Sequence, residues 1–309
     1  MPRTARPSQH GRWRRHPRSP VDSSRPAAAH ATIACVIDPM VQRMGVVSAA
    51  QLEAEGWRRN DRRRALAAGQ LTLVRAGWYA RQDADVDVVA AVRAHGCLSC
   101  ASALARHGAW IPERLRGVHV RMTRVADRRA AGCAPYGPVP SIRSAIDDVE
   151  TAFRCLLRCA EDEDLVVVAD SLLHLRLTTQ HELEGWSTSA PRRLRRALAR
   201  IDRAESGLET IVRVRLRAKG VSVRTQVQIG RHRVDLLVGD RLIVECDGGE
   251  HHAGWAAQTA DRARDRELSL AGYVVVRLTY GQIVHDWEAV EADLMAFVRA
   301  DRHRRRGTT

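Results

Sequence analysis

Short apolar runs alternate with polar segments in the last third of the chain. Val234–Val238, Leu242–Cys246 and Tyr273–Leu278 consist mainly of Val, Leu and Ile. Their length and β-branched side chains predict β-strands. A helix is predicted to begin after Ser206, and Asp286–Arg299 carries apolar residues at the spacing of a closing helix. The pattern therefore predicts a small sheet with helices packed against it.

Three short helices and a strand pair are predicted in the N-terminal third. Ile37–Gly45 has apolar residues at helical spacing, and Ser48 is the predicted cap of a second helix that ends at Gly56. Asn60 is the predicted cap of a third helix, and Leu71–Tyr79 alternates like two strands around a turn. Helix, helix, turn, helix and β-wing is the layout of a winged helix-turn-helix domain.

The middle of the chain is predicted to be mostly helical. Helices are predicted over Val86–His95, Cys97–His107, Ser144–Cys159, Asp164–His174, Thr178–Trp186 and Pro191–Arg203. The alternating segment Val118–Arg124 predicts one strand, which a Gly- and Pro-rich loop follows. The predicted domains are a disordered basic tail at 1–31, a winged helix at 32–82, a helical connecting region at 83–204, a C-terminal α/β domain at 205–301 and a basic tail at 302–309. The fold class is therefore α+β multidomain.

Acidic residues interrupt two of the apolar runs. Asp235 lies inside one run, and Glu245 and Asp247 end the next. Carboxylates rarely lie on strands of this kind without compensation. A three-residue loop at Gly239–Arg241 would place Asp235 opposite Glu245, whereas a two-residue loop would place the two side chains on opposite faces. We prefer the longer loop because it gathers six residues on one apolar face: Val234, Leu236, Val238, Leu242, Val244 and Cys246.

A cation would relieve the repulsion among these acids. Hard carboxylate oxygens suit Mg²⁺ or Mn²⁺, and Mg²⁺ commonly uses one or two carboxylates together with water and substrate phosphate. An ion held in this way activates water and stabilises charge on a phosphodiester. The alternative is that these acids are the solvent-facing ends of an antiparallel hairpin.

The segment that contains these acids resembles a known nuclease family. The resemblance rests on VDLLVGDRLIVECDGGEHH, on the D-x-x-R-D-x-x-L pattern of 261–268, and on GYVVVRLTY. It is to the very-short-patch-repair-endonuclease-like family of the PD-(D/E)xK superfamily, and it covers roughly 206–300. It implies a restriction-endonuclease-like α/β/α domain with a small mixed sheet and divalent-metal hydrolysis of nucleic acid. It further implies that Asp235 and Glu245 bind the metal, with the backbone carbonyl of Cys246 as a further ligand.

The chain departs from the family pattern at Asp247, where many superfamily members have lysine. Asp247 would assist in placing the metal or the water. His251, His252 or Arg264 could orient the attacking water, and either histidine could serve as general base or acid. The family position of Arg264 implies that it faces the scissile phosphate and neutralises developing charge.

Glu209 is open to two interpretations. It follows Ser206 by three residues, which is the spacing of a capping box with no further role. The family pattern instead implies an acid on this first helix that faces the metal. In that position Glu209 would tune the site.

Five arginines cluster at the start of the third predicted helix: Arg58, Arg59, Arg62, Arg63 and Arg64. A recognition helix presents such residues to a DNA groove, and plain surface charge is the alternative. The segment resembles the winged-helix domain of type IV toxin–antitoxin antitoxins. This resemblance implies sequence-specific DNA binding and a cognate toxin as a partner.

The composition favours a polyanionic partner. The formal net charge is +14 and the sequence pI is near 10.6, while no 18-residue apolar run could form a membrane span. Seven cysteines without a disulfide framework indicate a reducing cytoplasm. Cys97 and Cys100 form a Cys-x-x-Cys pair with no partner pair at zinc-finger spacing, so we predict that they pack within a helix. Cys155 and Cys159 are predicted to lie in the core.

The sequence therefore predicts a metal-dependent DNA endonuclease that an N-terminal winged helix directs to its target. The alternative is a DNA-binding regulator or antitoxin whose nuclease fold has lost turnover. RNA stays open as a substrate, because a metal site of this kind does not read the sugar.

Overall fold

The computed structural model describes residues 44–122, 132–248 and 255–304, and within 255–260 it describes only the side chain of Thr259. His251 and His252 lie outside the described residues. The predicted helix at Ile37–Gly45 also lies outside them, except for its last two residues.

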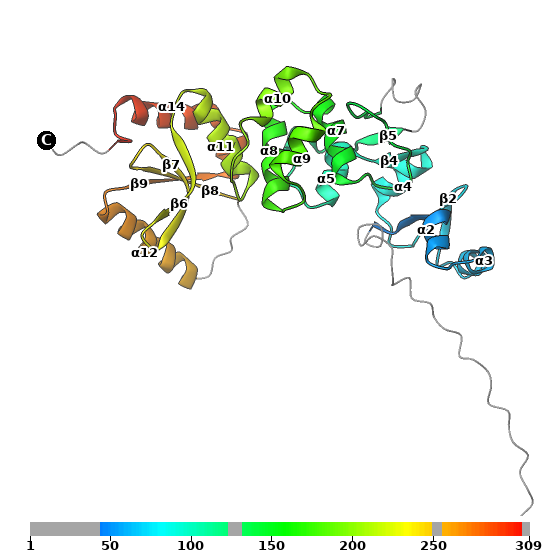
Figure 1. Cartoon of the computed structure of the whole chain (residues 1–309). Coiled ribbons are helices and arrows are strands. Elements are labelled where there is room, and N and C mark those ends of the chain that lie inside the picture. The colour runs from blue at the N-terminus through cyan, green and yellow to red at the C-terminus, as the bar shows by residue number, and fades with distance from the viewer. Residues whose placement is uncertain (1–43, 123–131, 249–254, 305–309) are drawn as a thin grey trace, which may run out of the picture. The chain divides into compact units, whose positions relative to one another are not determined.

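Two short helices and a three-stranded antiparallel sheet begin the described chain (Figure 1). Their bounds are β1 Val46–Ser48, α2 Ala49–Ala54, α3 Arg59–Ala67, β2 Thr72–Arg75 and β3 Trp78–Ala80, and the strand order is β1-β3-β2. Ser48 caps α2 as predicted, because its Oγ accepts a hydrogen bond from the Gln51 N–H at 3.2 Å. The predicted cap of the third helix is wrong. Helix α3 begins before Asn60, and Asp61 supports its first turn by accepting from the Arg58 N–H at 2.8 Å.

The middle of the chain is mostly helical but also contains a strand pair. Its elements are α4 Val86–Arg93, β4 Gly96–Leu98, α5 Cys100–Arg106, η1 Glu113–Leu115, β5 Val120–Met122, α7 Val149–Cys159, α8 Asp162–His174, α9 Gln180–Trp186 and α10 Arg192–Leu198. The prediction of one helix over Cys97–His107 is therefore wrong. Gly96 pairs with Met122, and a Cβ at Gly96 would come within 2.5 Å of Val120 Cγ1. Only glycine permits this close approach of β4 to β5.

The helix predicted from Ser144 begins only at Val149. Ile146 forms a β-bridge with Leu98, which holds the preceding segment in an extended conformation. Asp148 then caps α7 by accepting from the Thr151 N–H at 2.7 Å.

The C-terminal third forms a four-stranded mixed sheet with the order β6-β7-β8-β9. Its elements are α11 Gly207–Ala218, β6 Val223–Ile229, β7 His232–Val238, β8 Leu242–Asp247, α12 Trp255–Leu270, β9 Val274–Thr279, α13 Tyr280–Val284 and α14 Trp287–Arg299. Strands β6, β7 and β8 are antiparallel, whereas β9 lies parallel to β8 after the crossover through α12.

The loop between β7 and β8 has the three-residue length that the sequence predicts. Val238 pairs with Leu242 and Leu236 pairs with Val244, which leaves Gly239–Arg241 as the loop. Gly239 has φ 60°, and a Cβ there would lie 2.6 Å from the backbone oxygen of His303. Glycine is therefore required at this turn.

Helices cover both faces of the sheet (Figure 1). On one face Leu236 and Val244 pack in a core cluster with residues of α11, α13 and α14. On the other face Leu268 of α12 packs against Leu237 and Ile243. Val234 belongs to this second cluster, so its predicted place on the first face is wrong. The ladder is irregular beside it, where Gln226 of β6 has φ 53°.

Candidate active site

Asp235 of β7 and Glu245 of β8 come together on the sheet face that α12 covers. The paired residues of β7 and β8 end at Leu236 and Val244, and Asp235 and Glu245 are the next residue of each strand. The backbone N–H of Cys246 donates to Asp235 Oδ2 at 2.9 Å, which fixes the orientation of that carboxylate. Glu245 is only 5% exposed. The strand register thus brings together two acids that lie ten positions apart in the sequence.

The surroundings of Glu245 shift its titration. Burial and the neighbouring charge of Asp235 raise the pKa of Glu245 to about 7, against the opposing effect of Arg264. A divalent cation between the two carboxylates would relieve this repulsion. The oxygen donors and the charge repulsion of the pair therefore fit Mg²⁺ or Mn²⁺.

Two arginines reach this pair from neighbouring elements. Arg264 of α12 donates to Glu245 Oε1 at 2.7 Å and to the backbone oxygen of Arg233 at 2.6 Å. Its position follows from helical spacing, because the buried Leu268 lies one turn later on the same face. Arg277 of β9 pairs with Glu245 across the parallel ladder and forms an ion pair with Asp265 at 2.8 Å.

Glu209 joins the site from α11. Ser206 Oγ accepts from the Glu209 N–H at 3.3 Å, so half of the expected capping box is present. The Glu209 carboxylate instead accepts from Gln226 Nε2 at 2.6 Å and from the Glu205 N–H at 3.0 Å. Burial raises the pKa of Glu209, and the charge of Asp235 adds to this rise. Ser206 therefore caps α11, and the Glu209 carboxylate interacts electrostatically with Asp235.

Asp247 ends β8 next to this group and is half-buried. Its charge acts on Arg277 and on the Cys246 thiol, whose pKa is raised well above its usual value by burial and by the surrounding acids. No lysine of this chain can complete the site in the usual way, because Lys219 is the only lysine in the sequence and pairs with Glu291. Positive charge at the site therefore comes from arginine.

Sequence reasoning missed Gln226 and Arg277. Arg277 had a readable signal, because it is the one charged residue inside the apolar segment GYVVVRLTY. A charged side chain on an apolar strand needs compensation, and this argument, which identified Asp235 and Glu245, applies to Arg277 as well. Gln226 had no such signal, since its role depends on the φ of 53° that directs it toward Glu209.

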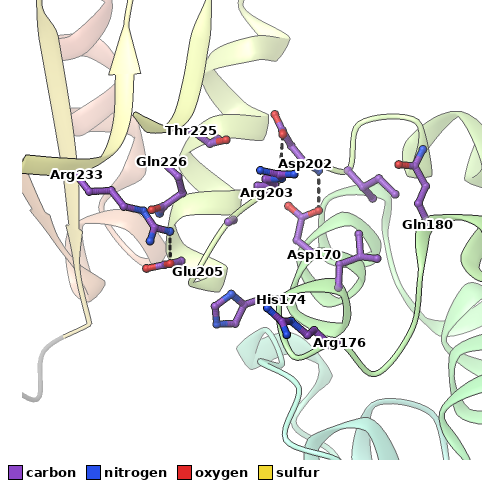
Figure 2. Close-up of a pocket in the computed structure, with 13 residues that line it drawn as sticks. Asp170, His174, Arg176, Gln180, Asp202, Arg203, Glu205, Thr225, Gln226 and Arg233 are labelled. Atoms are coloured by element: carbon purple, nitrogen blue, oxygen red, sulfur yellow. Dashed lines mark hydrogen bonds and ion pairs between the residues drawn. The ribbon is translucent and has the colours of Figure 1, made fainter. Parts of the chain in front are cut away.

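A pocket with a volume of about 890 Å³ lies beside the acidic group. Figure 2 shows His174 and Arg176 from the end of α8 on one side, and Gln226 and Arg233 from the sheet on another. Each acid in its lining has an arginine partner: Asp170 pairs with Arg213, Asp202 with Arg217 and Glu205 with Arg233. The basic residues of the lining are thus not outweighed by unpaired acids. Because Gln226 lines the pocket and donates to Glu209, the pocket borders the acidic site.

The five N-terminal arginines differ in their surroundings. Arg58, Arg59, Arg63 and Arg64 are exposed at the start of α3. The side chain of Arg62 is only 12% exposed and forms an ion pair with Glu53 of α2 at 2.8 Å. Arg64 pairs with Asp61 at 2.5 Å. Arg59 and Arg63, one helical turn apart, present their charge on a common face.

Comparison with known proteins gives a match for the C-terminal part of the chain. No curated protein matches it. A model of the REase_MTES_1575 family, which is a restriction endonuclease-like family, matches residues 208–298. The matched segment contains β6 to β9 and the acids described above. Helices long and apolar enough to cross a membrane are absent from the described residues. Residues 208–298 are thus similar to a restriction endonuclease-like domain, which supports a nuclease-like domain in the C-terminal part of the chain.

Proposed function

We propose that the protein is a metal-dependent DNA endonuclease of the very-short-patch-repair-like type. The observation that carries this proposal is the pairing of half-buried Asp235 with buried Glu245, in which burial and the charge of Asp235 raise the pKa of Glu245 to about 7. The family match to a restriction endonuclease-like domain supports it.

Each residue of the site has a distinct role in this proposal. Asp235 and Glu245 would hold Mg²⁺ or Mn²⁺ with the backbone carbonyl of Cys246, and the bound ion would supply an activated water and charge stabilisation. Glu209 keeps the Asp235 side of the site negative, and Asp247 does so at the end of β8. Arg264 stabilises negative charge that develops on the scissile phosphate. His251 or His252 accepts or donates the proton.

Basic side chains in the pocket beside the acidic site support a nucleic-acid substrate. His174, Arg176 and Arg203 line it. Arginine suits phosphate because its planar group donates two parallel hydrogen bonds. We infer that the strand leaving the scissile phosphate crosses this pocket.

The test is cleavage of supercoiled plasmid by the full chain with Mg²⁺ or Mn²⁺, with a structured RNA of similar length assayed in parallel. Nicking or linearisation that requires the metal supports the proposal. Cleavage of RNA alone would show that the substrate is RNA, and the proposed metal site would still stand. Binding without cleavage of either substrate would overturn the enzymatic role.

Metal binding should weaken as the pH falls below 7. Glu245 has a pKa of about 7, so below this pH a proton must leave before the cation binds. We expect the Mn²⁺ dissociation constant to rise about tenfold per pH unit there. In the metal-free protein the same shift makes the free energy of unfolding fall as the pH rises from 4.5 to about 7, because the folded state holds the proton more tightly. Calorimetric titration at several pH values measures the first effect, and a pH-independent constant would contradict it.

We also propose that residues 32–82 form a winged helix-turn-helix domain that binds DNA through α3. The exposed Arg59 and Arg63 then contact phosphates. Replacing both with alanine should weaken DNA binding and reduce the slope of log affinity against log salt by about two. The matched control is Arg62→Ala, since Arg62 already pairs with Glu53. An equal loss of salt dependence in the control and the double variant would refute this assignment.

A DNA-binding regulator or antitoxin without turnover is the second candidate function. The observation that favours it is the hydrogen bond that Arg264 donates to the Glu245 carboxylate, combined with Asp247 in the place of lysine. In that case a cognate toxin would be a partner. The plasmid assay distinguishes the two functions, because a regulator binds the DNA and leaves it intact.

A further inference from the structure

Four side chains with soft or borderline ligand atoms converge in the middle of the chain. The sulfurs of Cys100, Cys133 and Cys159 and a ring nitrogen of His119 all lie within 4.8 Å of one another. This is the one group of three or more such residues found at that spacing within the described part of the chain. It is formed by residues outside the nuclease-like domain.

The separations fit a tetrahedral zinc ion. With Zn–S near 2.3 Å and Zn–N near 2.0–2.1 Å, ligand atoms at tetrahedral angles lie about 3.8 Å apart for two sulfurs and about 3.6 Å apart for sulfur and nitrogen. Cys133 Sγ lies 3.8 Å from Cys159 Sγ and 3.5 Å from His119 Nδ1. A disulfide would require about 2.05 Å, so the sulfurs stand at the separation of two ligands of one ion.

Four separate segments of the chain supply these ligands. Cys100 is the first residue of α5, Cys159 is the last residue of α7, His119 precedes β5, and Cys133 forms a β-bridge with Arg121. Cys100 has φ 51°, a left-handed conformation that costs energy for a residue with a Cβ. Such strain persists where the surrounding structure requires the side chain in one place.

Backbone hydrogen bonds hold the ligands in position. The backbone carbonyl of His119 accepts a hydrogen bond from the Ser99 N–H at 2.9 Å. The backbone N–H of His119 donates to Ser102 Oγ at 2.9 Å. The N–H of Cys133 donates to the Val120 carbonyl at 2.8 Å. His119 is thus fixed to the start of α5, and Cys133 is fixed to β5.

Two nearby cysteines differ from these four. Cys97 lies on β4, is fully buried and contacts Asp147 Oδ1 at 3.3 Å. Cys155 is fully buried in the core, as predicted. Cys97 lies on β4 and Cys100 begins α5, so the prediction that both pack within one helix is wrong. Cys159 is exposed, so the prediction that it is a core residue is also wrong. Cys97 and Cys155 are therefore matched controls.

We propose that Cys100, His119, Cys133 and Cys159 bind one Zn²⁺ as a closed structural site. Three thiolates and one imidazole complete a tetrahedral shell, which leaves no open position for substrate. The three thiols release their protons to solvent on binding. The ion ties the start of α5 and the end of α7 to the strand β5, in the region that connects the two ends of the chain.

The test is the zinc content of the purified full chain, with cobalt substitution as a second measurement. We expect about one zinc per chain in the wild type, in Cys97→Ser and in Cys155→Ser, and a loss of most of it in Cys133→Ser and His119→Ala. Cobalt added to the metal-free wild type should give the intense absorption of a tetrahedral site and a thiolate charge-transfer band. The cobalt spectrum requires no variant, so it decides the matter even if Cys133→Ser fails to fold.

The double variant Asp235→Asn/Glu245→Gln separates this site from the proposed nuclease site. It should keep its zinc, because hard carboxylates do not contribute to the cysteine cluster. A wild type that contains no zinc and gives no tetrahedral cobalt spectrum would overturn the proposal. A disulfide between Cys133 and Cys159 in freshly purified protein, seen as a mass two units lower, would also overturn it.

Discussion

Asp235→Asn should lower the rate of plasmid cleavage by about 1,000-fold or more while leaving the fold intact. The change removes one charge from the carboxyl pair that is proposed to hold the metal, and a loss of about 4 kcal/mol of transition-state stabilisation corresponds to this factor. The amide oxygen can still accept the hydrogen bond that Cys246 N–H donates to the carboxylate at 2.9 Å, so the strand pair should be retained. Single-turnover cleavage with saturating Mg²⁺ measures the effect.

The matched control is Asp240→Asn in the same hairpin. Asp240 is exposed in the loop, and its change removes the same charge without touching the site. We expect cleavage within about twofold of the wild type, since surface charges of this kind have small effects. Equal loss of activity in both variants would indicate a general effect of charge and would contradict the role of Asp235.

Arg213→Met should destabilise the protein by about 3–5 kcal/mol, because it leaves a buried carboxylate without its partner. Arg213 of α11 and Asp170 of α8 form an ion pair in which both side chains are at most 1% exposed. Thr210 Oγ1 and the Asp202 N–H also donate to the Asp170 carboxylate, each at 2.9 Å. This buried network joins the middle region to the nuclease-like domain, so its loss should destabilise both parts of the chain.

Urea unfolding of the two proteins measures this effect, and Arg193→Met is the control. Arg193 pairs with Asp162 on the surface, with exposed fractions of 66% and 37%, so its loss should cost less than about 1 kcal/mol. Burial raises the pKa of Asp170. The penalty of Arg213→Met should therefore shrink as the pH falls, because protonation of Asp170 removes the unpaired charge. Similar unfolding midpoints for both variants would show that the pair contributes little.

The hairpin at the centre of the site could be predicted because its pattern is local. Apolar alternation on two short runs and the turn sequence Gly239-Asp240-Arg241 together determine one register, and Asp235 and Glu245 directly follow its last pair, Leu236 and Val244. The place of Arg264 follows from helical spacing before Leu268. These features depend on residues close together in the sequence.

Other parts of the site and fold depend on contacts between distant segments. The cysteine and histidine cluster combines ligands from four segments that are separated by 13 or more intervening residues, so no finger-like spacing reveals it. The strand β4 has three residues and forms only because β5 pairs with it, which local helical spacing cannot show. The place of Gln226 depends on a backbone φ that glutamine rarely adopts.

Manganese binding to the full chain tests the central claim most directly, namely that Asp235 and Glu245 share one divalent cation. Calorimetry at a pH of about 8 should show one Mn²⁺ site in the wild type and in Asp240→Asn. Asp235→Asn and Glu245→Gln should each raise the Mn²⁺ dissociation constant by about 100-fold or more, since each variant replaces one carboxylate ligand of the ion with an amide. Unchanged manganese binding in both of these variants would contradict the account.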